Sequence, residues 1–446
     1  MVHTFEADGT YYLFDNAVGA LHICDRLTAE VVKKINGEKY DLSAVDEETV
    51  REIEAEIEEL KREGVLFAEE EKEIPLKSDL VKALCLHICH DCNLRCEYCF
   101  AGQGNYKGRT EYMSFGVAKA AVDFLISNSG NRKILEMDFF GGEPLMNLSV
   151  VKKTVDYAKE QGKKHNKKFL FTLTTNGVLL NEETAKYLNE EMENVVLSID
   201  GRREVHDGVR KTVNGKGSYD VIIENIKNFV KMRGDKHYYV RGTFTKKNLD
   251  FANDVLYLAD EGLTEISLEP VVTDENSPLY IGEKDVPAVA EEYRRLAREY
   301  KRRYAAGERL FNFFHFQIDL TGGPCLKKRV SACGAGNEYV AVTPSGDIYP
   351  CHQFAGNPET RMGSVLDGTF DIQAQKKYKE CNVLNKEECS RCWAKYYCSG
   401  GCAANAYIYN EDINKPYKMA CLLEKKRLEC ALAIYALKYL KEGAVQ

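Results

Sequence analysis

Apolar residues between about 80 and 270 alternate between short runs typical of strands and longer stretches at helical spacing. The strand-like runs lie at 84–88, 135–140, 169–174, 194–199, 239–244 and 265–269. Helical stretches separate them, at 115–127, 148–161, 182–190 and 218–232. Strands that alternate with helices build a parallel sheet with right-handed crossovers. We therefore expect an α/β fold, a partial (β/α)6 barrel whose ligands bind at the carboxyl ends of its strands.

The first 75 residues are predicted to form a separate small domain in which strands precede helices. The expected elements are a strand at 10–14 and helices at 29–35 and 47–63. Asp46 can cap the start of the second helix, and Gly64 can end it. The acidic stretch 69–73, followed by Pro75, indicates a domain boundary.

The rest of the chain divides into three predicted regions. The barrel occupies 80–270, a bridging region with a basic helix near 291–303 occupies 271–320, and a Cys- and Gly-rich domain occupies 321–446. An apolar helix at 422–440 closes the chain. Since we find neither an apolar run of about 18 residues nor a secretory signal, we expect a cytoplasmic protein that does not enter a membrane.

Charge and cysteine usage narrow the function. The formal net charge is −8, so no global basic field attracts nucleic acid. Sixteen cysteines in a cytoplasmic protein indicate metal or redox chemistry rather than disulfides. They are also clustered: six lie between Cys24 and Cys99, and ten between Cys325 and Cys430.

Three of these cysteines follow the first predicted strand in a Cys-x3-Cys-x2-Cys loop, as Cys92, Cys96 and Cys99. A four-iron cluster needs four ligands, so three thiolates leave one iron open to a small molecule. A zinc loop is the alternative interpretation of the same spacing.

The next predicted strand ends in Gly141-Gly142-Glu143-Pro144. Glycines there permit close backbone approach to a ligand, and Glu143 can accept a hydrogen bond from an ammonium group. The cysteine loop followed by this segment resembles the radical S-adenosylmethionine (SAM) superfamily. The resemblance implies that the three cysteines hold a [4Fe–4S] cluster, that SAM chelates its open iron, and that Gly141, Gly142, Glu143 and Pro144 hold the methionine ammonium.

The resemblance extends to further SAM contacts. Tyr98 matches the aromatic residue that lies by the adenine, and Thr175 and Asn176 match a segment that faces the ribose. Ser198 and Arg210 resemble the pair that binds the SAM carboxylate. Ordinary turn chemistry and surface charge are the alternative for each of these segments. The two cysteines outside the loop, Cys85 and Cys89, are expected to be buried structural residues.

The C-terminal cysteines resemble the SPASM domain of radical SAM peptide-modifying enzymes. The resemblance assigns an outer auxiliary [4Fe–4S] cluster to Cys389, Cys392, Cys398 and Cys421, and an inner one to Cys333, Cys351 and Cys402. Either Cys325 or a substrate thiolate completes the inner cluster, which gives three clusters in all. Zinc is again the competing interpretation of Cys-x2-Cys pairs. Cys381 and Cys430 remain structural.

One departure from the family pattern is informative. Relatives that oxidise a sulfatase side chain carry an aspartate base directly after the cysteine that matches Cys351, whereas here His352 and Gln353 follow it. This difference weakens the interpretation as a sulfatase maturase. Asp347 is expected to serve a turn rather than to replace the base.

Together the three parts resemble maturases of Cys-rich ribosomally made peptides, above all the SCIFF maturases that form thioethers. In them a winged-helix-like domain, matched here by residues 1–75, binds the precursor's leader as an added strand. The resemblance implies a 5′-deoxyadenosyl radical that abstracts hydrogen and a Cys-sulfur-to-carbon thioether, with an electron donor such as ferredoxin or flavodoxin. Dehydrogenating, epimerising or carbon–carbon coupling maturases, an electron carrier and a zinc-bound scaffold are the alternatives.

Overall fold

The computed structural model describes residues 1–71, 78–321 and 323–441. Its centre is an eleven-stranded sheet in the order β12-β11-β10-β8-β7-β6-β4-β13-β14-β15-β16. Six parallel strands form the barrel wall: β4 (Ala83–Cys89), β6 (Ile134–Gly141), β7 (Lys168–Thr175), β8 (Asn194–Ser198), β10 (Tyr238–Phe244) and β11 (Glu265–Pro270). Each agrees with a predicted strand to within a residue at either end. The expected partial barrel is therefore confirmed, and the two-residue β12 (Asn312–Phe313) extends its edge.

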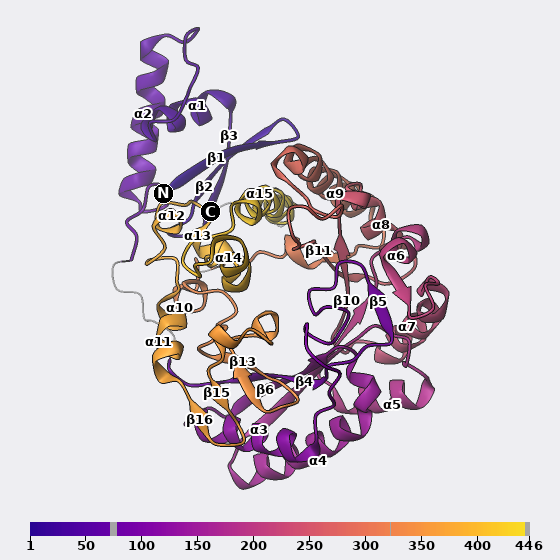
Figure 1. Cartoon of the computed structure of the whole chain (residues 1–446). Coiled ribbons are helices and arrows are strands. Elements are labelled where there is room, and N and C mark those ends of the chain that lie inside the picture. Colours follow the sequence, from indigo (N-terminus) through magenta and orange to yellow (C-terminus); the bar gives the residue numbers. More distant parts are fainter. Residues whose placement is uncertain (72–77, 322, 442–446) are drawn as a thin grey trace.

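Helices cover the outer face of the barrel (Figure 1). They are α3 (Phe115–Asn128), α4 (Leu148–Lys164), α5 (Glu182–Glu191), α6 (Arg203–Val209), α7 (Tyr219–Arg233) and α8 (Ala252–Asp260). The four predicted helices correspond to α3, α4, α5 and α7. Alternate residues of each strand pack against them, such as Val240 and Phe244 of β10, which are fully buried in the main hydrophobic core. The remaining alternate residues of each strand face the barrel interior.

The Cys-rich region joins the barrel sheet directly. Strand β13 (Tyr339–Val342) pairs parallel with β4, and β14 (Asp347–Tyr349), β15 (Gly363–Ser364) and β16 (Thr369–Phe370) continue the sheet antiparallel. Short helices follow, α11 (Ile372–Glu380), α12 (Glu387–Ser390), α13 (Lys395–Cys398) and α14 (Ala403–Asn410). The long α15 (Lys418–Lys441) packs on α9 (Val286–Ala306), and both match predicted helices. None of the four strands was predicted, because each is only two to four residues long.

The N-terminal unit is a three-stranded antiparallel sheet followed by two helices (Figure 1). The strands β1 (Val2–Ala7), β2 (Thr10–Asp15) and β3 (Ala20–Cys24) precede α1 (Arg26–Ile35) and α2 (Glu47–Arg62). Asp46 caps α2 by accepting a hydrogen bond from the Thr49 amide at 2.8 Å, and Gly64 follows its end at φ +74°. Both predictions for this helix are confirmed. The predicted boundary at Pro75 lies outside the described residues.

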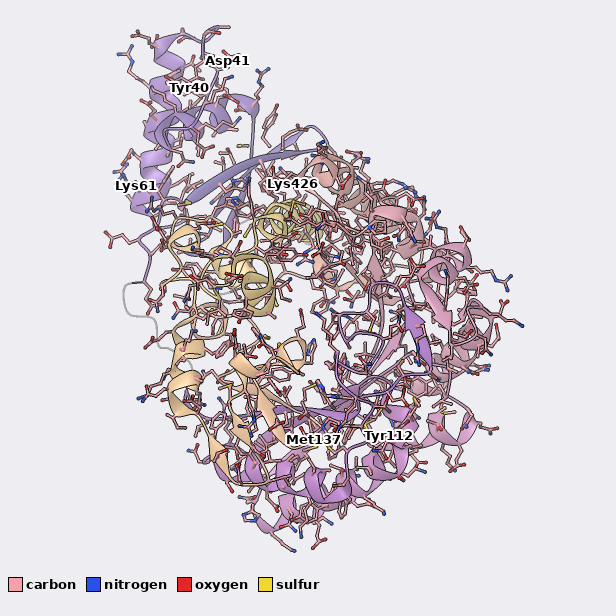
Figure 2. All side chains as sticks on the ribbon, viewed as in Figure 1. Tyr40, Asp41, Lys61, Tyr112, Met137 and Lys426 are labelled. Atoms are coloured by element: carbon pink, nitrogen blue, oxygen red, sulfur yellow. The ribbon has the colours of Figure 1, made fainter. Side chains whose placement is uncertain are left out.

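The two faces of this small sheet have different partners. Leu13 faces α1 and α2, where it joins a core of its own with Val31 and Ile57. Phe14 faces the Cys-rich region and packs edge-on against Trp393, with ring centroids 6.3 Å apart. Tyr40 and Asp41 lie at the outer end of the unit, on the side away from the barrel (Figure 2). The sheet thus connects the helical pair to the body of the molecule.

No helix in the described part of the chain combines the length and apolarity that a membrane span requires.

Candidate active site

A cavity of about 1820 Å³ lies at the carboxyl ends of the barrel strands and extends to the Cys-rich region. Cysteines from the two ends of the sequence line it: Cys85 of β4, Cys92, Cys96 and Cys99 from the loop after β4, and Cys325, Cys333, Cys398, Cys402 and Cys421 from the C-terminal third. Seven of the ten predicted ligands therefore share one cavity. The other three, Cys351, Cys389 and Cys392, are not among its lining residues.

The cysteine loop is held at one end by a short ribbon. Strand β5 (Leu94–Cys96) pairs antiparallel with β9 (Arg210–Thr212), so that Cys96 stands opposite Arg210. Burial, together with the nearby Glu143 and the thiols of Cys96 and Cys99, raises the pKa of Cys92 to about 12. The three thiols thus lie close to one another, and a metal bound at Cys92 and Cys96 would be needed to hold these two as thiolates at neutral pH.

Glycines let the end of β6 press against this loop. A Cβ on Gly142 would lie 1.9 Å from the Asp91 carbonyl oxygen, and a Cβ on Gly141 would lie 2.3 Å from that of Cys89. The Gly142 amide donates to Cys89 at 2.8 Å, and the Glu143 amide donates to Asp91 at 2.9 Å. The close approach expected from the glycines is therefore made to the backbone of the cysteine loop.

Glu143 connects the segment predicted to hold the SAM ammonium with the segment predicted to face the ribose. Its fully buried carboxylate accepts hydrogen bonds from the Thr175 hydroxyl and the Asn176 amide, both at 2.8 Å. Burial raises the pKa of Glu143 to about 7, although these hydrogen bonds oppose the shift. The Asn176 side chain also donates to Asn93 at 2.7 Å, inside the cysteine loop. The predicted ammonium and ribose segments therefore form one continuous wall.

A buried carboxylate that the sequence did not single out organises the opposite wall. Asp200 accepts hydrogen bonds from the Tyr98 hydroxyl at 2.7 Å, from Arg210 Nε at 2.9 Å and from the Thr243 amide at 2.9 Å. The Arg210 guanidinium also lies 5.4 Å from the centre of the Tyr98 ring. The predicted adenine and carboxylate residues are thus locked together, with Ser198 beside them on the cavity wall. The signal was present in the sequence as an aspartate two residues after Ser198.

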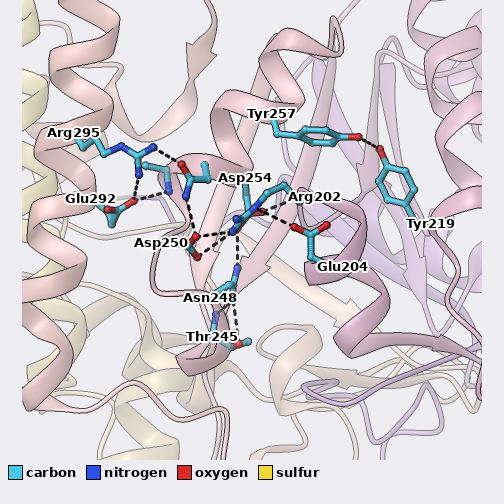
Figure 3. A network of polar contacts seen from close by, with 12 residues as sticks. Arg202, Glu204, Tyr219, Thr245, Asn248, Asp250, Asp254, Tyr257, Glu292 and Arg295 are labelled. Atoms are coloured by element: carbon cyan, nitrogen blue, oxygen red, sulfur yellow. Dashed lines mark hydrogen bonds and ion pairs between the residues drawn. The ribbon is translucent and has the colours of Figure 1, made fainter.

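A polar network outside the barrel fixes the loop that carries Asp200 (Figure 3). Arg202 donates to the buried Asp254 of α8 through its amide at 3.0 Å and its Nε at 2.8 Å. Asn248 supplies a further hydrogen bond to Asp254 at 3.1 Å. Only glycine is accommodated at position 201, where a Cβ would lie 2.3 Å from that of Asp254 at φ +123°. These contacts restrain Asp200 before any ligand arrives.

Several of the C-terminal thiols predicted to be cluster ligands lie near one another. Burial raises the pKa of Cys351, and the neighbouring thiols of Cys402 and Cys333 raise it further. Burial likewise raises the pKa of Cys421 to about 11, with a further contribution from Cys389 and Cys392.

Cys398, the remaining predicted ligand of the outer group, also lies near Cys421 and Cys389. Burial, together with Glu424, Cys421 and Cys389, raises the pKa of Cys398 to about 12. Cys325 lies on the cavity wall and is exposed, so both alternatives for completing the inner group stay open. Cys381 is buried and donates to the Ile413 carbonyl oxygen at 3.2 Å, as suits a structural cysteine.

The position after Cys351 carries no carboxylate. His352 lies on the cavity wall and packs on Phe140, with ring centroids 5.0 Å apart. Burial lowers its pKa to about 4, so the ring is neutral at neutral pH. Asp347, the first residue of β14, accepts a hydrogen bond at 2.8 Å from Ser345 in the turn before that strand, and another at 2.6 Å from Arg361. Its predicted role in a turn is confirmed.

The residues around the cavity suit the groups that the sequence predicts. Thiol sulfur is the ligand type that iron–sulfur clusters and zinc prefer. Within the described ranges no three His, Cys, Asp or Glu side chains are placed to hold a single metal ion. A volume of about 1820 Å³ has room for a cluster, a nucleoside and a segment of peptide together. Cys92, Cys96 and Cys99 would hold the cluster, and Glu143 and Arg210 lie where a bound amino acid needs partners.

Comparison with known proteins agrees with this geometry. Residues 86–248 match the radical SAM superfamily, and residues 333–393 match the SPASM iron–sulfur cluster-binding domain. An uncharacterised protein of Methanocaldococcus jannaschii is 33% identical over 193 residues, which cover 43% of this chain and 63% of that protein. The cysteine-type anaerobic sulfatase-maturating enzyme of Clostridium novyi is 25% identical over 71% of this chain and 86% of its own length.

Two solved structures share the fold. The enzyme anSMEcpe with bound AdoMet aligns at a TM-score of 0.67 and 22% identity, over 81% of this chain and 100% of that chain. Streptococcus suis SuiB bound to the precursor peptide SuiA aligns at a TM-score of 0.52 and 16% identity, over 94% of this chain and 98% of that chain.

Proposed function

We propose that this chain, which combines a radical SAM α/β fold with a C-terminal SPASM domain, is a maturase that installs a Cys-sulfur-to-carbon thioether in a Cys-rich ribosomal peptide. Its cofactors are SAM and multiple [4Fe–4S] clusters. The observation that carries the proposal is the single cavity in which the Cys92 loop faces the C-terminal thiols. A peptide cysteine in that cavity would lie between a hydrogen-abstracting centre and thiol-ligated metal.

The N-terminal unit supports a peptide substrate. Strand β3 is an edge of its sheet, and Ile23 on that strand is 45% exposed. A free edge offers backbone donors and acceptors to an added strand. The turn before β3 also meets the cavity rim, since a Cβ on Gly19 would lie 2.8 Å from the hydroxyl oxygen of Tyr397, a cavity residue. A leader bound at β3 would therefore deliver the following residues to the cavity.

The protein's own residues bind, orient and shield the reactants. When bound, SAM and the cluster at Cys92, Cys96 and Cys99 supply a radical that abstracts hydrogen from an unactivated carbon. Glu143 would hold the amino group of SAM, and the Asp200–Arg210 pair would fix the opposite side of the ligand. The cavity walls exclude water and hold the target carbon in one orientation.

The inner thiol group suits a role in preparing the substrate sulfur. Cys333 and Cys402 line the cavity, and the buried Cys351 lies near them. A thiol that coordinates a metal is deprotonated outright, so a substrate cysteine bound there would not require a carboxylate base. This account agrees with His352, rather than an acid, following Cys351.

A second candidate is a dehydrogenating, epimerising or carbon–carbon coupling maturase on the same scaffold. SuiB and anSMEcpe share this fold. Because their sequence identity to this chain is below 25%, the shared fold does not specify which reaction this chain catalyses. The missing aspartate after Cys351 disfavours dehydrogenation.

Mass spectrometry would test the proposal. The Cys-rich peptide encoded beside this chain's gene is incubated anaerobically with the reconstituted enzyme, SAM and a reductant, and then reduced and alkylated. A loss of two hydrogens together with one cysteine that no longer alkylates supports a thioether. A loss of two hydrogens with every cysteine alkylated indicates coupling or oxidation elsewhere and refutes the thioether assignment.

Formation of 5′-deoxyadenosine tests the first cysteine group separately. Replacing Cys92, Cys96 and Cys99 by alanine should abolish it. Cys381→Ala is the matched control, because Cys381 is buried beside Ile413 and does not line the cavity. Persistent cleavage of SAM in the triple variant would contradict the assignment.

A further inference from the structure

Strand β10 carries an arginine in the middle of the barrel. Along the strand Tyr238, Val240 and Phe244 are buried against the outer helices, whereas Arg241 is exposed and lines the cavity. Arg241 therefore points inward, where the cavity rather than bulk solvent surrounds it. Within residues 1–71, 78–321 and 323–441 no side chain forms a hydrogen bond or ion pair with its guanidinium.

Glu269, a carboxylate within electrostatic range of Arg241, already has other partners. Glu269, on the neighbouring strand, lies 3.5 Å from Arg427 and 3.4 Å from His315. Arg427 also pairs with Glu424. The Glu269 carboxylate is thus paired with Arg427 of α15, and although it lies within electrostatic range of Arg241 it makes no hydrogen bond or ion pair with that guanidinium in the described residues.

Arg241 lies on the sheet beside Ser198, a residue predicted to bind SAM. Parallel pairing places Arg241 in register with Ser198 of β8 on one side and with Ser267 of β11 on the other. Residues in register on adjacent strands point to the same face of a sheet. Arg241 therefore stands beside Ser198 at the same level of the barrel, and its charge acts on Glu269 and on His352.

A guanidinium in such a setting selects its ligand by shape as well as charge. Its planar fork donates two parallel hydrogen bonds to a carboxylate. Inside a walled cavity that pairing is screened less than it would be on a surface. The other cavity arginines are occupied, because Arg210 is bound to Asp200 and Arg427 to Glu269 and Glu424.

We propose that Arg241 anchors a carboxylate of the substrate peptide, from an Asp or Glu side chain or from the C-terminus, and thereby sets which residue faces the radical. The inference rests on the proposed function, since it requires a peptide in this cavity. It implies an acidic group within a few residues of the modified position. The carboxylate of SAM has the same chemistry, so the experiment must separate the two sources.

The first arm uses SAM alone. Arg241→Gln and wild type are compared for 5′-deoxyadenosine formation without peptide across SAM concentrations. An unchanged KM for SAM, within about twofold, assigns Arg241 to the peptide. A rise of tenfold or more assigns it to SAM and overturns the proposal. Iron content and cluster absorbance, matched to wild type, show that the variant is folded.

The second arm uses the peptide encoded beside the gene, with each acidic side chain changed singly to its amide and the C-terminus amidated. Losing one charge-assisted pair should lower kcat/KM by about ten- to a hundredfold. One peptide variant should show this loss with wild-type enzyme and no further loss with Arg241→Gln. Arg309→Gln, an exposed arginine at the opposite end of the barrel strands, should leave kcat/KM unchanged.

The outcomes separate the two proposals. If wild type modifies the peptide but no neutralised position depends on Arg241, the inference is refuted while the proposed function stands. If wild type fails to modify the peptide, the proposed function fails first. Should Arg241→Gln lose its clusters, the neutralised peptides with wild type decide alone, because uniform activity across them overturns the anchor.

Discussion

Replacing Gly142 by alanine should displace the cysteine loop. The new Cβ would lie 1.9 Å from the Asp91 carbonyl oxygen, closer than the 3.0 Å below which real Cβ contacts essentially never occur. The carbonyl must therefore move by at least about 1.1 Å, the difference between these distances. The Glu143 amide donates to this same oxygen at 2.9 Å, so the shift takes that hydrogen bond out of range.

The expected cost follows from those contacts. Forcing an extra carbon into a packed site costs about 1–3 kcal/mol. Losing the hydrogen bond to Asp91 adds about 1 kcal/mol. We therefore expect Gly142→Ala to lower stability by about 2–4 kcal/mol and to weaken cluster binding at Cys92 selectively. If three four-iron clusters are present, bound iron should fall by about a third.

Iron analysis, electron paramagnetic resonance and calorimetry of the reconstituted protein would measure these effects. Gly116→Ala is the matched control, because Gly116 lies in α3 and its added Cβ would meet only the Ser114 hydroxyl at 3.6 Å. Alanine in a helix should be neutral or stabilising by up to about 1 kcal/mol. Full iron content and an unchanged melting temperature in Gly142→Ala would refute the close-approach argument.

Three further changes test other parts of the molecule. Asp200→Asn should destabilise the protein by about 3–5 kcal/mol in calorimetry, because it leaves the buried Arg210 without its counter-ion; an unchanged melting temperature would exclude this pairing. Phe14→Ala should cost about 3–5 kcal/mol and loosen the N-terminal sheet from Trp393, giving a separate calorimetric transition and poorer peptide modification with intact SAM cleavage; coupled unfolding would argue against it. Burial raises the pKa of Asp138 to about 7, so its charged form destabilises the fold increasingly as pH rises from about 4 to 7. Asp138→Asn should therefore gain at most about 4 kcal/mol relative to wild type at pH 8 and little at pH 4, and a pH-independent difference would contradict this.

The barrel strands were predictable because each is a local run of apolar residues with a turn on either side. The same reasoning missed β1, β3 and the strands from β13 to β16. Ala20–Cys24 has no fully buried residue, and Gly363–Ser364 is too short to show a period. These strands exist because neighbouring chain segments supply their hydrogen bonds, which no local pattern reveals.

The candidate site was likewise predictable only where its residues lie close together in the sequence. The spacing of Cys92, Cys96 and Cys99 identified the loop, because one short segment carries all three ligands. The partners of Arg210 depend on contacts formed across the barrel, so its pairing with Asp200 required the structure. The signal for Arg241 in the sequence is a charged residue at an inward position of a strand whose other residues are uncharged.

The sheet itself determines how far the two cysteine groups stand apart. Strand β4 leads into the Cys92 loop, and β13 pairs with it in register from Tyr339 opposite Ala83 to Val342 opposite Leu86. The chain then turns through β14 to reach Cys351. Because a shift of one residue would turn every side chain of β13 to the other face, this register is strongly specified. The separation of Cys351 from the Cys92 loop is therefore set by backbone pairing.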